Sequence, residues 1–167
     1  MITTTGEYAL RAAVMLAMNP KQPRTTAEIA ETTRVPAGYL SKIMQALVRA
    51  QLVDSQRGLG GGFVMRRDPS EVTVLDVLSA VDGLPQRIRK CPLGIDSHIR
   101  LCPVHKLVDD AVAHVETAFR SASLASLAHS ATGIAPLCAV KSLMAASQKP
   151  NGGSGKSAVP RPKSAKK

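Results

Sequence analysis

The sequence predicts a mainly α-helical fold with one small β-hairpin, arranged as a winged helix-turn-helix and followed by a long helix. Three observations predict it. Apolar residues recur at the spacing of buried helix faces in the first fifty residues and again between 73 and 120. Two short strand-like runs flank a glycine-rich segment between 52 and 66, and they directly follow a helix with one polar, basic face.

The composition is typical of a folded chain and limits the kinds of partner that it can bind. The chain has 167 residues, 44% of them hydrophobic, which can supply a core. Only 2% are aromatic, which argues for an aliphatic core and against an aromatic platform for single-stranded nucleic acid. The formal net charge is +10, but residues 148–167 alone hold five Lys and one Arg and no acid. The rest of the chain is therefore only mildly basic.

Neither membrane nor secretion signals are evident. The first apolar run, 9–18, contains Arg11 and is shorter than the roughly 20 residues of a membrane span. We therefore expect a cytoplasmic protein without a membrane partner. The three cysteines are too few, and odd in number, for a disulfide framework, so they are expected to be thiols, metal ligands or redox switches.

Two capping boxes predict where the first helices begin. Residues 1–20 predict a helix that starts at Thr4 with Glu7 as the reciprocal capping residue. Thr25 and Glu28 have the same spacing and open a short second helix.

The third predicted helix, residues 36–50, begins at Pro36 and has two distinct faces. The buried stripe is formed by Leu40, Ile43, Met44 and Leu47, and the opposite face carries Gly38, Lys42, Gln45 and Arg49. Two short helices of this kind, the second with a polar and basic outer face, are typical of a helix-turn-helix.

A hairpin follows directly. The runs 52–55 and 63–66 predict two strands, and the glycine-rich connection between them requires positive φ angles. This connection lacks the lysine of a phosphate-binding loop and leads into a strand rather than a helix, which argues against nucleotide binding. Between 34 and 67 there are six basic residues and one acid, the charge balance that phosphate neutralisation requires.

The second half of the sequence predicts helices at 73–81 and 102–120 and a last turn or two at 123–128. Asp109 and Asp110 are adjacent in the long helix and are interpreted as part of a solvated face. Because the winged helix already accounts for its own core, we expect the long helix to pack on a second subunit. Its apolar stripe comprises Val104, Val108, Ala111, Val112, Val115 and Phe119.

These elements divide the chain into four parts. Residues 1–83 are the expected winged helix-turn-helix domain, and 84–102 a cysteine-containing sensor loop. Residues 103–130 are the expected dimerisation helix with the short terminal helix. Residues 131–167 lose periodicity and end in Gly, Ser, Pro and Lys, so they are interpreted as a disordered basic tail.

Three motifs resemble a known family. The segments GEYALRA at 6–12, VPAGYLSKI at 35–43 and RGLGGGF at 57–63 are similar to the Rrf2 family of bacterial winged-helix transcription regulators, which includes the IscR and NsrR types. The likeness covers about residues 1–128. It implies a homodimer, held by the long helix, that binds a dyad-symmetric double-stranded DNA operator. In many relatives the loop before that helix carries three cysteines that bind an iron–sulfur cluster.

The sequence departs from that pattern in the loop, where only Cys91 and Cys102 are present. The resemblance implies Cys91, Cys102 and His105 as ligands of a cluster, favoured as [2Fe–2S], with Glu7 of the partner subunit as the fourth. His98 is the competing histidine, and Cys138 is a poor candidate. The alternatives are a thiol redox switch, another metal such as zinc, and no cofactor.

The expected function is a dimeric, sequence-specific DNA-binding regulator, a repressor, whose operator affinity responds to a redox or iron–sulfur signal. Lys42 and Gln45 are expected to read bases, and Arg57 to lie along the backbone or in the minor groove. An enzyme with a cysteine nucleophile is disfavoured because little of the chain is left for a substrate pocket. A non-specific DNA binder that relies on the lysine tail is the other alternative. The expected DNA-binding residues are Thr26, Pro36, Gly38, Tyr39, Ser41, Lys42, Gln45, Arg49, Arg57, Gly60 and Gly61.

Overall fold

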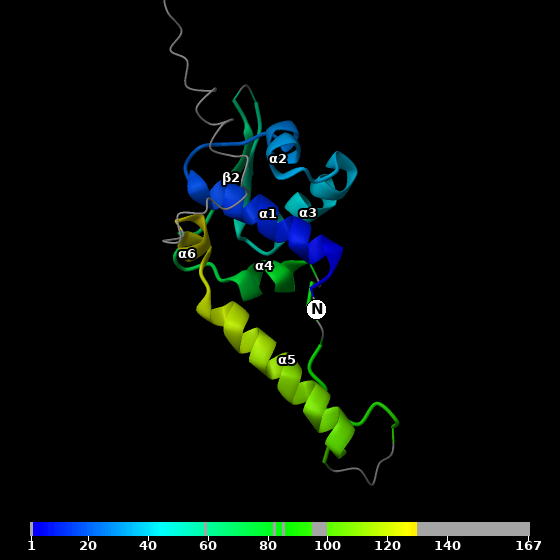
Figure 1. Ribbon diagram of the computed structural model, residues 1–167. Helices are drawn as coiled ribbons and strands as arrows, with labels where there is room; N and C mark the ends of the chain where they lie inside the picture. The colour runs from blue at the N-terminus through cyan, green and yellow to red at the C-terminus, as the bar shows by residue number, and fades with distance from the viewer. Residues whose placement is uncertain (1, 59, 82, 85, 95–99, 130–167) are drawn as a thin grey trace, which may run out of the picture.

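A computed structural model describes residues 2–58, 60–81, 83–84, 86–94 and 100–129. His98, Cys138 and the expected basic tail lie outside the described residues. The elements form a head and a projecting helical arm (Figure 1). In chain order they are α1 (Thr4–Met18), α2 (Thr26–Thr33), α3 (Ala37–Arg49), β1 (Val53–Gln56), β2 (Gly62–Met65), α4 (Val74–Ala80), α5 (Pro103–Ser121) and α6 (Leu124–Ala128). The predicted fold class is confirmed.

Helix α1 is the centre of the head, and its middle is buried on all sides from Ala12 to Ala17. The capping box predicted at Thr4 and Glu7 is wrong. Thr3 is the N-cap, and its Oγ1 accepts a hydrogen bond from the N–H of Gly6 at 3.0 Å. Thr4 therefore lies inside the helix, and Glu7 instead forms an ion pair with Arg11 one turn later.

Helices α2 and α3 form the helix-turn-helix. The capping box at Thr25 and Glu28 is confirmed: the N–H of Thr25 donates to Glu28 Oε2 at 2.7 Å, and the N–H of Glu28 donates to Thr25 Oγ1 at 3.2 Å. The backbone hydrogen bond from Thr25 lowers the pKa of Glu28. Arg34 turns the chain in the left-handed conformation. Pro36 is the N-cap of α3, one residue before its predicted role as the first helical residue.

The hairpin is antiparallel and pairs Val53 with Met65 at its base. Its strands, 53–56 and 62–65, are each shifted by one residue from the predicted runs. A third segment joins it, because Arg24 and Phe63 exchange two backbone hydrogen bonds of 2.9 and 2.8 Å. The hairpin is thus attached to the segment that precedes α2.

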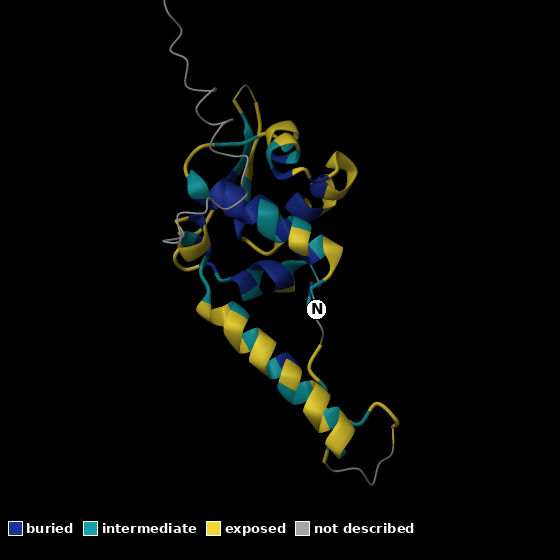
Figure 2. Cartoon of the chain, viewed as in Figure 1, coloured by how far each residue is buried: buried dark blue, intermediate teal, exposed yellow. Residues whose placement is uncertain are grey.

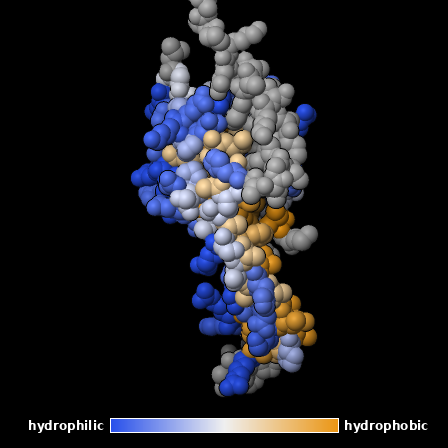
Figure 3. Space-filling model, turned by 60° about the vertical axis from the view of Figure 1, so that its left-hand side comes forward, coloured by the Kyte–Doolittle hydropathy of each residue, from blue (hydrophilic) through white to orange (hydrophobic). Residues whose placement is uncertain are grey.

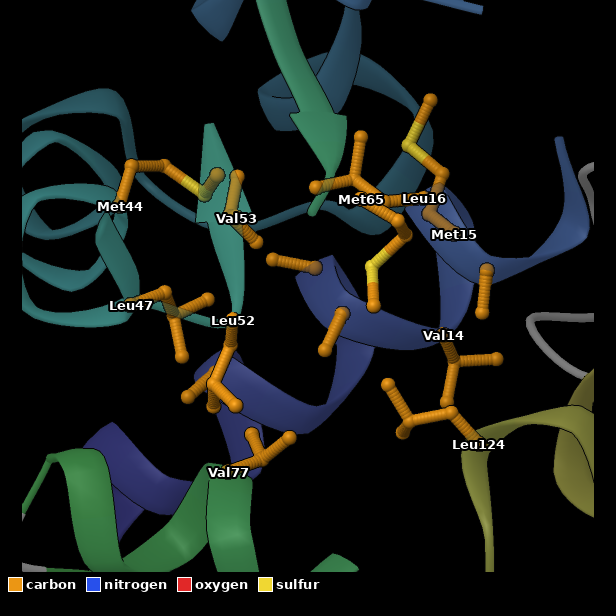
Figure 4. Close-up of a cluster of buried hydrophobic side chains, with 14 of the residues drawn as sticks. Val14, Met15, Leu16, Met44, Leu47, Leu52, Val53, Met65, Val77 and Leu124 are labelled. Carbon is orange, nitrogen blue, oxygen red and sulfur yellow. The ribbon is translucent and has the colours of Figure 1, made fainter. Parts of the chain in front are cut away.

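The core is aliphatic, as the composition predicts, with methionines filling part of it (Figure 4). Helix α6 closes this core: Leu124 is fully buried, and its N–H donates to the carbonyl of Val72 at 2.8 Å. The chain therefore returns to the head after α5. The buried side chains of Figure 4 come from α1, α3, the segment through β1, β2, α4 and α6, and include Leu16, Met44, Leu47, Leu52, Val53, Met65, Val77 and Leu124.

Helix α5 forms the arm, and the other helices and the hairpin form the head. The arm is exposed along most of its length, as Figure 2 shows. Its C-terminal end lies beside α4 and α6, and its N-terminal end lies far from the head together with the loop that precedes it (Figure 1). Only Val112 is buried among its residues. Within the described ranges, no helix is both long and apolar enough to cross a membrane.

Candidate nucleic-acid interface and cysteine site

Helix α3 presents its polar face to solvent. Leu40, Ile43 and Leu47 fix its orientation by packing in the core. The opposite face is left free, and Tyr39 keeps 58% of its surface exposed. The exposed residues of this face are Gly38, Tyr39, Ser41, Lys42, Gln45 and Arg49, all of which are DNA-binding candidates from the sequence.

A hollow of about 600 Å³ adjoins this face. Tyr39, Lys42 and Arg49 line it from α3. Thr5 of α1 and the end of α4 complete its wall, which the spacing of α3 alone could not indicate. The hollow gives α3 a basic groove on one flank.

Tyr39 is supported from behind by α1. Its ring meets the ring of Tyr8 edge to face, with centroids 6.1 Å apart and planes at 71°. The Arg11 guanidinium lies 5.8 Å from the centroid of the Tyr8 ring, and Arg11 is ion-paired with Glu7. Helical spacing along α1 predicts burial but gives no sign of this stack.

The remaining interface candidates lie at the same end of the head, on α2 and the hairpin (Figure 1). Thr26 is the first residue of α2 and is half-buried. Arg57 is exposed in the connection between the strands. Gly60 has a φ of +78°, and a Cβ on Gly61 would come within 2.4 Å of the Gln56 carbonyl oxygen, so both positions require glycine.

Free positive charge is concentrated on this surface. Arg66 pairs with Asp54 at 3.4 Å, and Arg24 lies 3.7 Å from Glu28. Lys42, Arg49 and Arg57 have no acidic partner among the residues that the structure describes. Unpaired cations beside an exposed helix face are suited to phosphate contacts.

The cysteine site lies at the far end of the arm. Cys102 is the N-cap of α5, and its Sγ is 3.4 Å from His105 Nδ1. The Sγ of Cys91 is 3.9 Å from the same nitrogen. The structure thus brings together three of the four residues suggested as ligands. Glu7 is not among them, because α1 lies in the head of the same chain (Figure 1).

Thiolates and imidazole are donors that hold iron–sulfur clusters, so this set is of the right chemical type. A [2Fe–2S] cluster takes four ligands, whereas the described residues bring together three donors here, two sulfurs and one nitrogen. No group of three or more His, Cys, Asp or Glu residues in the described part is arranged to hold a metal ion. The described residues of one chain therefore do not complete a cluster site.

A strap, residues 86–90, fastens the cysteine loop to α5. Arg87 holds Asp109 through two hydrogen bonds of 2.6 and 2.7 Å, and its Nη1 lies 3.5 Å from Glu116. The N–H of Ile88 donates to Asp109 Oδ1 at 2.9 Å. The hydrogen bonds from Arg87, helped by that of Ile88, lower the pKa of Asp109 to about 2, and the pKa of Arg87 is raised.

The interpretation of Asp109 as a solvated residue is therefore wrong: its side chain is only 14% exposed. Asp110 does fit that interpretation, because it pairs with the exposed Lys106 on the helix surface. The distinction depends on Arg87, which is 22 residues away in the sequence and could not be paired with Asp109 from helical spacing.

The outer face of α5 is apolar and uncovered. Figure 3 shows hydrophobic side chains gathered along one side of the arm. Val104, Leu107, Val108 and Val115 are all exposed there, Leu107 by 71%. The predicted stripe omits Leu107 and includes Val112, which is buried instead. Contiguous exposed apolar residues of this kind mark an association surface.

Comparison with known proteins gives a family match. The family model described as Rrf2, an iron-dependent transcriptional regulator, matches residues 2–130. The putative HTH-type transcriptional regulator BadM of Rhodopseudomonas palustris is 32% identical over 125 residues, covering 75% of this chain and 77% of that protein. The HTH-type transcriptional regulator IscR of Escherichia coli is 37% identical over 82 residues. That match covers 48% of this chain and only 51% of IscR.

Solved structures share the fold. CymR, the global cysteine regulator of B. subtilis, matches with a TM-score of 0.63 and 26% identity over 77% of this chain and 95% of its own. An oxidised form of Staphylococcus aureus CymR matches with a TM-score of 0.61, 26% identity, and coverage of 77% and 96%. IscR of T. potens, at 22% identity and a TM-score of 0.62, covers 91% of this chain and 93% of its own and shows the fold alone.

Proposed function

The chain belongs to the Rrf2 family of DNA-binding transcriptional regulators, which are not enzymes, and from that premise we propose that it is a cytoplasmic homodimeric repressor with a redox-responsive cysteine site. The observation that carries the proposal is the exposed, basic face of α3 beside the wing, which is the β1–β2 hairpin with the exposed Arg57 in its connection. Such a helix fits the major groove, with its first residues nearest the bases.

Base reading is assigned to Lys42 and Gln45. Both are exposed on α3, and these side chain types suit guanine and adenine respectively. Tyr39, Ser41 and Arg49 are assigned to nearby bases or phosphates. Thr26, Pro36, Gly38 and the wing residues Arg57, Gly60 and Gly61 complete the proposed contact surface.

A dimer would present two such heads. The apolar face of α5 is exposed in the single chain, and a second copy would bury it. A two-fold dimer reads a dyad-symmetric operator, with half-sites about one helical turn, roughly 34 Å, or a multiple of it apart.

The signal is assigned to Cys91, Cys102 and His105. Their convergence supports thiol chemistry at the end of the arm, and metal chemistry only with a further ligand. The relatives support the same class of signal, since the family description is iron-dependent and one structural neighbour was solved in an oxidised form. A cluster would need a ligand beyond these three, such as Glu7 of the partner subunit.

Selection of bound sequences from random duplex DNA tests the DNA-reading proposal. The full chain should enrich a dyad-symmetric motif. Lys42→Ala or Gln45→Ala should weaken binding to it about tenfold, because one good base contact contributes about 1–3 kcal/mol. Lys21→Ala, which removes an exposed charge between α1 and α2, is the control and should leave binding nearly unchanged. Failure to enrich any dyad motif, or equal losses in all three variants, contradicts the proposal.

Absorption spectra with iron and sulfide analysis test the signal. Protein purified without oxygen should show either a visible charge-transfer band, lost in Cys91→Ser and Cys102→Ser, or two thiols that form a reversible disulfide on mild oxidation. The first outcome identifies a cluster and the second a thiol switch. A colourless, iron-free protein whose thiols do not respond to oxidation rejects the sensor proposal and leaves DNA reading untouched.

A further inference from the structure

We propose that the chain has a second ligand site, an arginine cleft between the head and the arm that binds a small organic anion. The cleft has a volume of about 620 Å³, within the range of small-molecule pockets. It lies where α4, the strap and the C-terminal part of α5 meet. Its lining includes Leu75, Leu78, Leu84, Arg87, Arg89 and Arg120.

The lining is more polar than apolar, and its arginines lie beside three leucines. Leu78 is fully buried, and Leu75 and Leu84 are half-buried beside it. Arg89 of the strap and Arg120 of α5 lie at the opening. Charged groups at the opening of a concave site can hold and orient a small anion.

The two arginines at the opening are free to bind an anion, whereas Arg87 is occupied. Arg87 is held by Asp109 and Glu116. Arg89 and Arg120 have no acidic partner among the residues described. Both also line an adjoining hollow with Arg87 and Glu116, so the three arginines border the same space. The three arginines outnumber Asp109 and Glu116, so the net charge of the lining is positive. A guanidinium group can donate two parallel hydrogen bonds to carboxylate or phosphate oxygens.

Duplex DNA is not the occupant that the position favours. The cleft is formed by α4, the strap and α5, while α2 and the hairpin lie at the opposite end of the head (Figure 1). A head docked on DNA through α3 would turn this cleft away from the duplex. Its size and its arginines fit a small carboxylate or phosphate ester.

An occupant would touch three separate parts of the proposed regulator. It would join α4 of the head to α5 of the arm and to the strap, which ends next to Cys91. A ligand that prefers one relative arrangement of head and arm shifts the population toward it and changes operator affinity. This role as an effector site rests on the proposed function, whereas anion binding itself does not.

Calorimetric titration of the full chain tests the cleft. The probes are phenyl phosphate and citrate, with benzyl alcohol as an uncharged comparison. We expect at least one anion to saturate at one site per chain and the alcohol not to bind. Arg89→Gln combined with Arg120→Gln should weaken the anion about tenfold or more, because two charge-assisted contacts are lost. Arg100→Gln removes one exposed charge outside the cleft and should leave binding nearly unchanged.

Two results overturn the site: neither anion saturates, or Arg100→Gln weakens binding as much as the cleft variant. Operator affinity, measured by fluorescence anisotropy, separates the claim of anion binding from the claim of an effector role. The ligand-free cleft variant should bind operator as the parent does, and the anion should shift only the parent. An anion that binds without changing operator affinity rejects the effector role. Loss of operator reading in every variant rejects the proposed function instead and leaves the anion titration to decide the site.

Discussion

Asp109 is the residue on which the attachment of the cysteine loop depends. Its carboxylate accepts two hydrogen bonds from Arg87 and one from the backbone of Ile88. Its pKa of about 2 lies below the ordinary aspartate value of about 3.9. A depressed pKa means that the charged form is stabilised in the folded chain, so this stabilisation is complete above about pH 4 and is lost as the pH falls toward 2.

We therefore predict that acid releases the strap before it affects the remote core. The amide signal of Ile88 should shift and lose protection from exchange between about pH 4 and 2. Asp109→Asn should weaken that protection already at neutral pH, because the neutral amide cannot form the charged pair with Arg87. Nuclear magnetic resonance of the amide checks both. Asp110→Asn removes a neighbouring acid that pairs only with exposed Lys106, and the same response in that variant would contradict the assignment.

At the scale of elements, the same glycine-to-alanine change should have opposite effects in α3 and the wing. Gly38 lies in the first turn of α3, where a Cβ would meet no other atom within 4 Å, and its φ is not in the left-handed region. Alanine should therefore stabilise the helix by up to about 1 kcal/mol. The added methyl group stands on the exposed face, so operator affinity should fall. The unfolding temperature should rise, while the operator affinity measured by fluorescence anisotropy should fall. A rise in both would show that Gly38 is not in the interface.

Gly62 begins β2 with a φ of +153°, and a Cβ there would lie 2.5 Å from the carbonyl oxygen of Arg24. Gly62→Ala should strain this position by about 1–3 kcal/mol and break the backbone pairing between Arg24 and Phe63. Hydrogen exchange at the Phe63 amide should rise sharply. An unchanged exchange rate would show that the wing does not need this attachment.

Local patterns predict the elements well where the cause is local. The Thr25 box and the stripe on α3 depend on spacings of three and four residues, and both are found. The first capping box is wrong because Thr3, Thr4 and Thr5 all offer a hydroxyl, and packing of Gly6 against Leu78 and Gly83 selects Thr3 as the cap. That packing joins residues more than seventy positions apart, which no helical pattern reports.

The site residues also divide into those that local spacing predicts and those that come together only in the fold. The polar face of α3 follows from its buried face, so its residues could be named from the sequence. The pairing of Arg87 with Asp109, the stack of Tyr8 on Tyr39 and the convergence on His105 all join separate segments. The cysteines and His105 could be suggested as a set only through the family resemblance, and Arg87 gives no signal at all.

At the scale of the whole molecule, the head buries its apolar residues, whereas the arm leaves most of its own exposed. The head is closed by α6 and buries its own core, so it needs no partner to cover it. The arm buries only Val112 and leaves Val104, Leu107 and Val108 in solvent. A single chain would keep that exposed face only at the risk of non-specific association, and a two-fold pairing of α5 with its copy removes it.

If α5 forms the proposed dimer, Leu107→Glu should dissociate it without unfolding the head. The side chain is 71% exposed in the single chain, so a charge there costs the monomer little. Loss of a central interface side chain typically costs about 2 kcal/mol or more, so the dimer dissociation constant should rise at least about 30-fold. Sedimentation equilibrium measures this change, and thermal unfolding should show the head intact.

Leu93→Glu is the matched control. Leu93 is equally exposed, at 70%, but lies in the cysteine loop and not on the α5 face. If both variants dissociate equally, the interface extends over the loop; if neither does, α5 is not the dimerisation surface. Two linked heads bind the two half-sites of a dyad operator more tightly than one head binds a single half-site. Leu107→Glu should therefore lower operator affinity steeply. Each separated head should keep only weak, salt-dependent binding to DNA. A monomer that still binds the dyad operator as tightly as the parent would show that pairing of the arms is not what joins the heads.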